Sequence, residues 1–172
     1  MSHAPGKIRI ERLTKAHDRT SFDCGNVFLN SYLKQFARQN AAKGVARAYV
    51  AVPAGGEGSA IMGYYTLSAA SIGFEQVPLS LRRRLPRYPV PTARLGELAV
   101  NGEHQGQGLG SILLLDAFNR IDSIADELAV WAIVVDPIDD AAQAFYHHFG
   151  FEPLADNKSS LFLTLKDLRA WV

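Results

Sequence analysis

The stretch Gln105-Gly106-Gln107-Gly108-Leu109-Gly110 decides the fold of this chain. It joins an apolar segment at 95–100 to a segment at 111–121 with the apolar spacing of a helix. Three glycines in five residues let backbone N–H groups approach a ligand closely, and the helix that follows adds the positive end of its dipole. The stretch therefore predicts a loop that binds a pyrophosphate group.

A dinucleotide-binding loop is an alternative interpretation of the same residues. Gly106, Gly108 and Ser111 fit the G-x-G-x-x-G/A fingerprint loosely, and Asp126 lies at about the right distance. However, a Rossmann unit normally opens its domain with this loop, whereas most of this chain precedes it. Asp126 also comes before the next strand-like run, at 129–135, instead of ending it. The places of the loop and of Asp126 in the chain therefore disfavour a dinucleotide-binding loop, which stays open as an alternative.

A second landmark follows on the next predicted strand and helix. Residues 129–135 form a continuous apolar run typical of a buried strand, and residues 141–151 read Ala-Ala-Gln-Ala-Phe-Tyr-His-His-Phe-Gly-Phe. The Gln-x-x-Gly-x-Gly loop followed by an A-x-x-F-Y-x-x-x-G-F helix resembles the GNAT superfamily of N-acetyltransferases. The resemblance implies acetyl-CoA as cofactor, with its pyrophosphate on the loop formed by Gln105, Gly106, Gln107, Gly108, Leu109, Gly110 and Ser111.

The order of predicted elements agrees with an α/β fold. Apolar patterns predict six or so strands, at 8–13, 46–52, 60–69, 95–100, 129–135 and 160–165, with a Gly-rich turn at 55–58. An amphipathic helix is expected from Val27, with Val27, Phe28, Leu29, Tyr32, Leu33 and Phe36 in its apolar stripe, and a short basic helix at 78–85. We predict one domain over residues 1–172: a GNAT acyl-CoA N-acyltransferase fold with a mixed, mostly antiparallel sheet flanked by helices.

The resemblance also implies roles for residues on the fourth strand and the last helix. Leu98, Ala99 and Val100 would pair through their main chains with the thioester arm of acetyl-CoA. Tyr146 would be the general acid, since a phenol carries a proton at neutral pH; the alternative is that it only packs with its neighbours. Glu97 is a candidate general base, or equally a surface or paired acid.

Charge is distributed unevenly along the chain. Residues 1–96 hold 14 Lys and Arg against 5 Asp and Glu, whereas residues 97–172 hold 4 against 12. Such a field concentrates a polyanion near one side of the molecule, although a solvated basic surface or an acidic protein partner would explain it as well. The predicted nucleic-acid residues are Lys34, Arg38, Arg47, Arg82, Arg83, Arg84 and Arg87.

A narrower resemblance runs along nearly the whole chain. Phe22-Asp23-Cys24-Gly25-Asn26, the segment 63–68, the basic segment 81–91 and Leu98-Ala99-Val100 are similar to the toxin branch of the superfamily. Members of that branch are encoded with a ribbon-helix-helix antitoxin and acetylate the amino group of aminoacyl-tRNA, which blocks translation. The resemblance also allows a homodimer. Two alternatives remain: an acetyltransferase of a small amine or protein amino group without RNA, and a non-enzymatic partner of the antitoxin.

Other classes of protein are disfavoured by composition. No apolar stretch approaches the roughly 20 residues of a membrane span, and the N-terminus has no signal-peptide pattern, so we expect a cytoplasmic protein without a membrane partner. The single cysteine, Cys24, excludes an intramolecular disulfide, and no spacing of His, Cys or Asp predicts a metal site.

Overall fold

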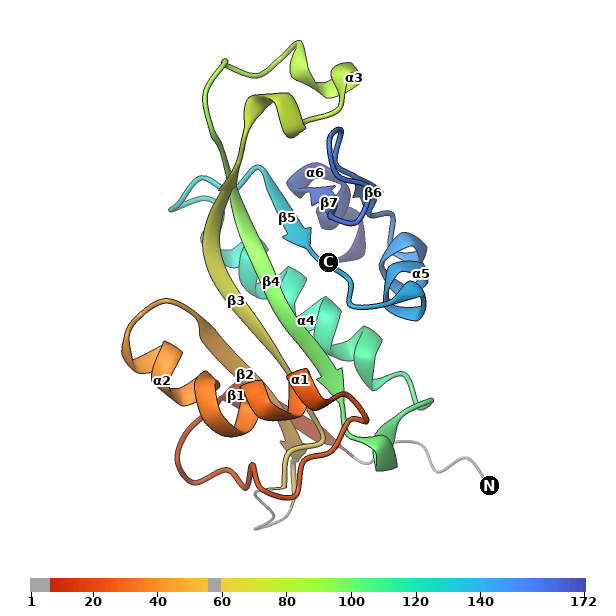
Figure 1. The fold of residues 1–172 in the computed structure, drawn as a ribbon. Coiled ribbons are helices and arrows are strands. Elements are labelled where there is room, and N and C mark those ends of the chain that lie inside the picture. The colour runs from red at the N-terminus through yellow and green to blue at the C-terminus, as the bar shows by residue number, and fades with distance from the viewer. Residues whose placement is uncertain (1–6, 56–59) are drawn as a thin grey trace. The chain divides into compact units, whose positions relative to one another are not determined.

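The structure is a computed structural model that describes residues 7–55 and 60–172. Its strands are hydrogen-bonded in the order β1-β2-β3-β4-β5-β7-β6 (Figure 1). β4 and β5 pair in parallel, whereas β1–β2, β2–β3, β5–β7 and β6–β7 pair antiparallel. This mixed, mostly antiparallel sheet confirms the predicted fold class. The strands are β1 (Ile8–Arg12), β2 (Arg47–Pro53), β3 (Gly63–Ile72), β4 (Val90–Val100), β5 (Ala132–Val135), β6 (Glu152–Pro153) and β7 (Leu161–Thr164).

Six α-helices, one π-helical turn and three 3-10 turns occur in the described residues. The α-helices are α1 (Val27–Ser31), α2 (Ala37–Ala42), α3 (Leu79–Arg82), α4 (Leu109–Ile124), α5 (Asp140–His148) and α6 (Leu165–Leu168). A π-helical turn, η1 (Tyr32–Phe36), joins α1 to α2, and single 3-10 turns lie at η2 (Phe74–Gln76), η3 (Gly102–His104) and η4 (Arg169–Trp171).

Residue contacts divide the chain into two compact units. The first unit contains Met1–Ser68 and Glu97–Ala117, and the second contains Ala69–Gly96 and Phe118–Val172. The single domain predicted over residues 1–172 remains a prediction, and part of the Gly-rich turn predicted at 55–58 lies outside the described residues.

In the first unit, α1, η1 and α2 cover one face of the sheet (Figure 1). Their buried residues Leu29, Leu33 and Ala37 share an apolar core with Val50 on β2 and Tyr64 on β3. The hydroxyl group of Tyr64 donates a hydrogen bond of 2.6 Å to the backbone oxygen of Leu29, so the helices are attached to the sheet by a polar contact as well.

The predicted apolar stripe of this first helix is partly wrong. Leu29 and Leu33 are buried as predicted, but Val27 and Phe28 are 79% and 87% exposed, and Phe36 is 48% exposed. A π turn contains more residues per turn than an α-helix, so the face that meets the sheet shifts from Tyr32 onward, which explains Phe36 but not Val27 and Phe28. The prediction assumed one continuous 3.6-residue period.

In the second unit, the apolar core lies around β5 and β7. Val134 and Phe162 from these strands pack with Ile72, Val77 and Val90. The second half of α4 contributes Phe118, whose ring packs against the rings of Phe149 and Phe151 at centroid distances of 6.3 and 6.2 Å. These aromatic contacts position the end of α5.

Several predicted boundaries are corrected by the structure. β4 begins at Val90 instead of 95, because residues 92–95 pair with β5. The basic helix predicted at 78–85 is only the short α3, and the two-residue β6 was not predicted because so short a strand carries no periodicity. No helix in residues 7–55 and 60–172 is long and apolar enough to cross a membrane.

Candidate active site

Gln105 ties the predicted pyrophosphate loop to the rest of the first unit. Its side-chain amide donates hydrogen bonds of 3.0 Å to the backbone oxygen of Cys24 and 2.9 Å to that of Val100. The backbone N–H of Gly102 also donates to the oxygen of Asp23, at 2.8 Å. The Gln105 side chain therefore positions the loop between the end of β4 and the start of α1.

The glycines of the loop have the conformation that an anion site requires. Gly106 and Gly108 adopt positive φ values of 77° and 83°, a region that residues with a Cβ rarely occupy. A Cβ atom built on either glycine would meet no atom of the described residues within 4 Å, so the space in front of the loop is open. Gly108 directly precedes α4, whose first-turn N–H groups lack acceptors within the helix. The loop thus fits the anionic pyrophosphate group of a cofactor.

β4 extends beyond its pairing with β5. The parallel register runs from Thr92↔Ala132 to Leu95↔Val135, and β4 continues to Val100. The three predicted pantetheine contacts, Leu98, Ala99 and Val100, lie in this extension. A strand segment without a neighbour on one side can offer backbone groups to an extended ligand.

Glu97 lies on β4, where its side chain contacts β3. Its side chain is half-buried, and its Oε2 accepts a hydrogen bond of 2.6 Å from the hydroxyl group of Thr66 on β3. The same hydroxyl accepts a hydrogen bond of 3.0 Å from the backbone N–H of Glu97. The negative charge of Glu97 raises the pKa of the nearby Tyr32 phenol, although burial is the larger cause. Glu97 is therefore a paired acid that also lies beside a half-buried aromatic group.

Tyr146 lies on α5 in the second unit and is only 7% exposed. Its ring packs edge to face against Phe145 and Phe151, each at a centroid distance of 5.2 Å. Burial raises the pKa of its phenol well above the ordinary value. Burial is the one cause of this shift, so no hydrogen bond from the described residues acts on the hydroxyl group. The phenol of Tyr146 is therefore neutral at pH 7, and its proton is available for donation.

The signature around Tyr146 has a structural explanation. Gly150 has a φ of 94° and ends α5, and the backbone N–H of Phe151 then donates to the oxygen of Tyr146 at 3.2 Å. This turn brings the Phe151 ring against Tyr146. The Gly-Phe part of the pattern thus supports the ring of the tyrosine.

The predicted nucleic-acid residues fall into two groups. Lys34, Arg38, Arg83, Arg84 and Arg87 are exposed. The guanidinium group of Arg82 is instead half-buried, donates to the backbone oxygens of Glu75 and Val77, and lies 5.7 Å from the ring centre of Phe74. Arg47 donates to the oxygen of Ala41 at 2.7 Å. Arg82 and Arg47 therefore hold local structure, a role that periodicity and charge counting could not reveal.

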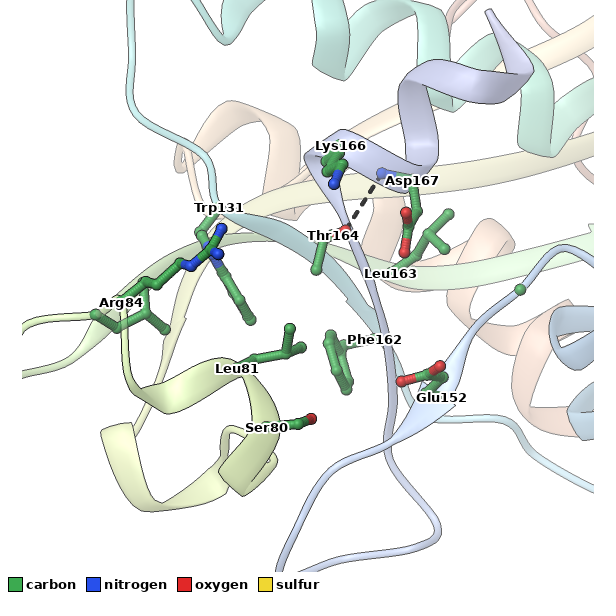
Figure 2. Close-up of a pocket in the computed structure, with 12 residues that line it drawn as sticks. Ser80, Leu81, Arg84, Trp131, Glu152, Phe162, Leu163, Thr164, Lys166 and Asp167 are labelled. Atoms are coloured by element: carbon green, nitrogen blue, oxygen red, sulfur yellow. Dashed lines mark hydrogen bonds between the residues drawn. The ribbon is translucent and has the colours of Figure 1, made fainter.

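A cavity of about 420 Å³ lies within the second unit, between α3 and β7. Figure 2 shows the side chains of Leu81 and Phe162 facing each other across it, with Trp131 beside them. Arg84, Lys166, Glu152 and Asp167 supply charged groups of both signs. Among the predicted site residues only Arg84 lines this cavity.

Metal binding receives no support from the part of the chain that the structure describes. No group of three or more His, Cys, Asp or Glu side chains there could hold a metal ion.

Comparison with known families decides the class of enzyme. Residues 46–153 match the family described as acetyltransferase (GNAT) domain. The chain belongs to the GNAT acetyltransferase family. This confirms the predicted family, and the loop at 105–110 and the whole of α5 lie inside the matched range.

Several relatives of this GNAT chain are toxins. It is 38% identical, over 94% of each chain, to the tRNA-acetylating toxin of Mycobacterium tuberculosis. A solved structure of AtaT complexed with acetyl-methionyl-tRNAfMet has a TM-score of 0.88 and 28% identity, over 95% of this chain and 98% of that one. A tyrosine-to-phenylalanine mutant of AtaT, bound to the C-terminus of the antitoxin AtaR and acetyl-CoA, has a TM-score of 0.80 and 27% identity, over 95% and 97%.

Proposed function

We propose that this acetyltransferase is a toxin that transfers an acetyl group from acetyl-CoA to the amino group of aminoacyl-tRNA. The observation that carries the proposal is the similarity over 94% of the chain to a tRNA-acetylating toxin. An acetylated amino group cannot accept a peptide, so translation stops. Because charged tRNA is found in the cytoplasm, we place the activity there.

The loop after β4 is the proposed cofactor site. Acetyl-CoA supplies an activated acetyl thioester. Backbone N–H groups from Gly106 to Ser111 would hold its pyrophosphate, with the α4 dipole adding attraction for the negative charge. The side chain of Gln105 acts indirectly, because its amide is already bonded to two backbone oxygens. Leu98, Ala99 and Val100 would bind the pantetheine arm through their main chains.

Tyr146 is the proposed general acid. Acyl transfer from a thioester leaves a thiolate, which needs a proton as its charge develops. The neutral phenol of Tyr146, with its hydroxyl group free of other partners, is suited to donate that proton. Its packing against Phe145 and Phe151 limits the motion of the ring and so fixes the position of the donor.

Glu97 is the proposed base for the acceptor amine. An amino group must lose a proton before or during attack, and a carboxylate can accept that proton directly or through a water molecule. The bond from Thr66 to Oε2 holds the carboxylate in one orientation.

Two macromolecular partners follow from the same proposal. Exposed Lys and Arg side chains on η1 and α2, and on the segment 83–87, would contact tRNA phosphates. Such contacts do not depend on the nucleotide sequence of the tRNA. An antitoxin of the ribbon-helix-helix class would neutralise the toxin, since an AtaT structure contains the C-terminus of its antitoxin.

The experiment is transfer of radiolabel from acetyl-CoA into total charged tRNA, with uncharged tRNA and free amino acids as controls. We expect label only in the charged pool. Label in free amines or proteins, with none in charged tRNA, would replace the proposal by an acetyltransferase that acts without RNA.

A further inference from the structure

The helical segment formed by α1, η1 and α2 carries an aromatic row whose two outer rings the fold leaves exposed. Residues Leu29, Leu33 and Ala37, spaced by four, are buried against the sheet. One position before each of them stands an aromatic residue: Phe28, Tyr32 and Phe36. Phe28 is 87% exposed, Phe36 is 48% exposed and Tyr32 is half-buried. An aromatic side chain left in water loses the free energy that burial would supply, so such a row suggests a ligand.

The middle of this aromatic row lies beside the candidate base. The rings of Tyr32 and Tyr64 stack with an interplanar angle of 2° at a centroid distance of 6.4 Å. The hydroxyl group of Tyr32 accepts a hydrogen bond of 3.2 Å from Asn40, and the charge of Glu97 acts on the Tyr32 phenol. Glu97 therefore lies close enough to the middle of the row for its charge to act there.

The exposed end of the row is held next to the cofactor loop. Asn26 caps α1 by accepting a hydrogen bond of 3.0 Å from the N–H of Leu29. The preceding residues, Asp23 and Cys24, accept the hydrogen bonds from Gly102 and Gln105. Phe28 thus lies in the first turn of a helix whose start is fixed to the cofactor loop by hydrogen bonds.

Charge along the same segment favours an anionic ligand. Lys34 and Arg38 are exposed on the other side of the buried residues, and no acid occurs between Asp23 and Glu57. The carboxylate of Asp23 is itself engaged by the N–H of Gly25 and the amide of Asn30, at 2.9 and 3.0 Å. Exposed aromatic rings combined with cations are typical of sites for single-stranded nucleic acid, where bases stack and phosphates pair with cations.

We infer that Phe28, Tyr32 and Phe36 form a stacking platform for the unpaired nucleotides at the 3′ end of aminoacyl-tRNA. The inference rests on the proposed function and names the part of the substrate that the first unit holds. Bases stack on the exposed rings of Phe28 and Phe36, and the esterified amino acid then lies at Glu97. Phe28 is a positioning residue, because it orients the acceptor without touching the reacting atoms.

The test compares two RNA hairpins that share an acceptor-stem duplex, one with an unpaired 3′ trinucleotide and one with a blunt end. Fluorescence anisotropy measures the affinity of each for the wild type and for Phe28→Ala, Phe28→Trp and Val45→Ala. Val45 is 58% exposed and lies outside the row, so Val45→Ala is the matched control. We expect the wild type to bind the unpaired end about tenfold more tightly than the blunt end.

The expected results separate stacking from a structural role. Phe28→Ala should lose the tenfold preference while keeping its affinity for the blunt hairpin and for acetyl-CoA, and Phe28→Trp should retain the preference. An unchanged preference in Phe28→Ala would overturn the inference. If Phe28→Ala instead loses only the binding of the purified antitoxin, the row is a protein interface. Acetylation of charged tRNA by the wild type, measured in parallel, shows whether the proposed function itself holds.

Discussion

The two regions that carry the candidate chemistry differ in how their polar groups are used. Around the cofactor loop, the Gln105 amide and the Glu97 carboxylate both bind neighbouring groups of the first unit. On α5, the pKa of Tyr146 is raised by burial alone, so no hydrogen bond from the described residues acts on its hydroxyl group. Groups that are already bonded hold a backbone or a side chain in place, whereas an unpartnered hydroxyl group is available to donate a proton. We therefore expect the first region to hold its groups in fixed positions, the proposed base Glu97 included, and Tyr146 to supply the proton.

The largest expected effect is that of Tyr146→Phe, which removes the proton donor but retains the ring packing. We expect kcat to fall by about 10²–10⁴-fold with acetyl-CoA affinity unchanged. Acetyl transfer to charged tRNA and calorimetric titration of acetyl-CoA measure the two quantities. Tyr88→Phe, at a tyrosine that is 65% exposed, is the control. Full activity in Tyr146→Phe would remove the distinction between the two regions.

Gly108→Glu should have the next largest effect, on cofactor binding. The new side chain stands at the open face of the loop, and its charge repels pyrophosphate, so we expect acetyl-CoA affinity to fall by about tenfold or more. Gly44→Glu is the matched control, because Gly44 also has a positive φ, of 72°, with open space around it. Both variants bear a similar backbone strain of roughly 1–2 kcal/mol. A difference between their acetyl-CoA affinities, measured by calorimetry, therefore reports on the pyrophosphate loop.

Replacing Arg83, Arg84 and Arg87 together by Gln should weaken RNA binding and flatten its salt dependence. Removal of up to three phosphate contacts lowers the slope of log K against log salt by about 2. Arg82→Gln is a useful comparison, since Arg82 binds backbone oxygens and should reduce thermal stability instead. Equal slopes in wild type and triple variant would move the RNA surface away from this segment.

Gln105→Ala should cause a moderate loss of stability and a weaker affinity for acetyl-CoA. Two hydrogen bonds to backbone oxygens are lost, but these exposed acceptors can bind water, so we expect a cost of about 1 kcal/mol. For a chain of this length the expected change in Tm is about 2–4 °C by calorimetry. Gln39→Ala, at an exposed position on α2, should leave both quantities unchanged.

The smallest expected effect concerns pH. Burial raises the folded-state pKa of Tyr146 above its ordinary value of about 10, so the phenol keeps its proton at pH 7 and at pH 9. Because the shift is upward, this group's pH-dependent effect on stability and activity begins only above about pH 10. A profile of kcat between pH 7 and 9.5 should therefore show no alkaline decline due to Tyr146. A decline in the wild type that Tyr146→Phe abolishes would contradict this assignment.

The sequence predicted the architecture well where patterns are local and strongly periodic. The loop at 105–110 and the helix carrying Tyr146 lie where the patterns placed them, and the strand predicted at 129–135 is present but begins only at Ala132. The π turn at Tyr32–Phe36 was not predictable from a 3.6-residue period, and Phe36 at its end is exposed. The structural roles of Gln105 and Arg82 depend on backbone oxygens that the fold brings near, and residue type alone does not reveal such contacts.

The most direct test of the proposed activity is to locate the acetyl group after the reaction. Charged tRNA treated with acetyl-CoA and the purified protein is digested with ribonuclease, and the released 3′-terminal adenosines are identified by mass spectrometry. We predict N-acetyl-aminoacyl-adenosine for at least one amino acid, and a product yield in Tyr146→Phe lower by the expected fall in kcat when both are measured at early times. Acetyl groups found only on nucleobases, or only on protein, would contradict the account.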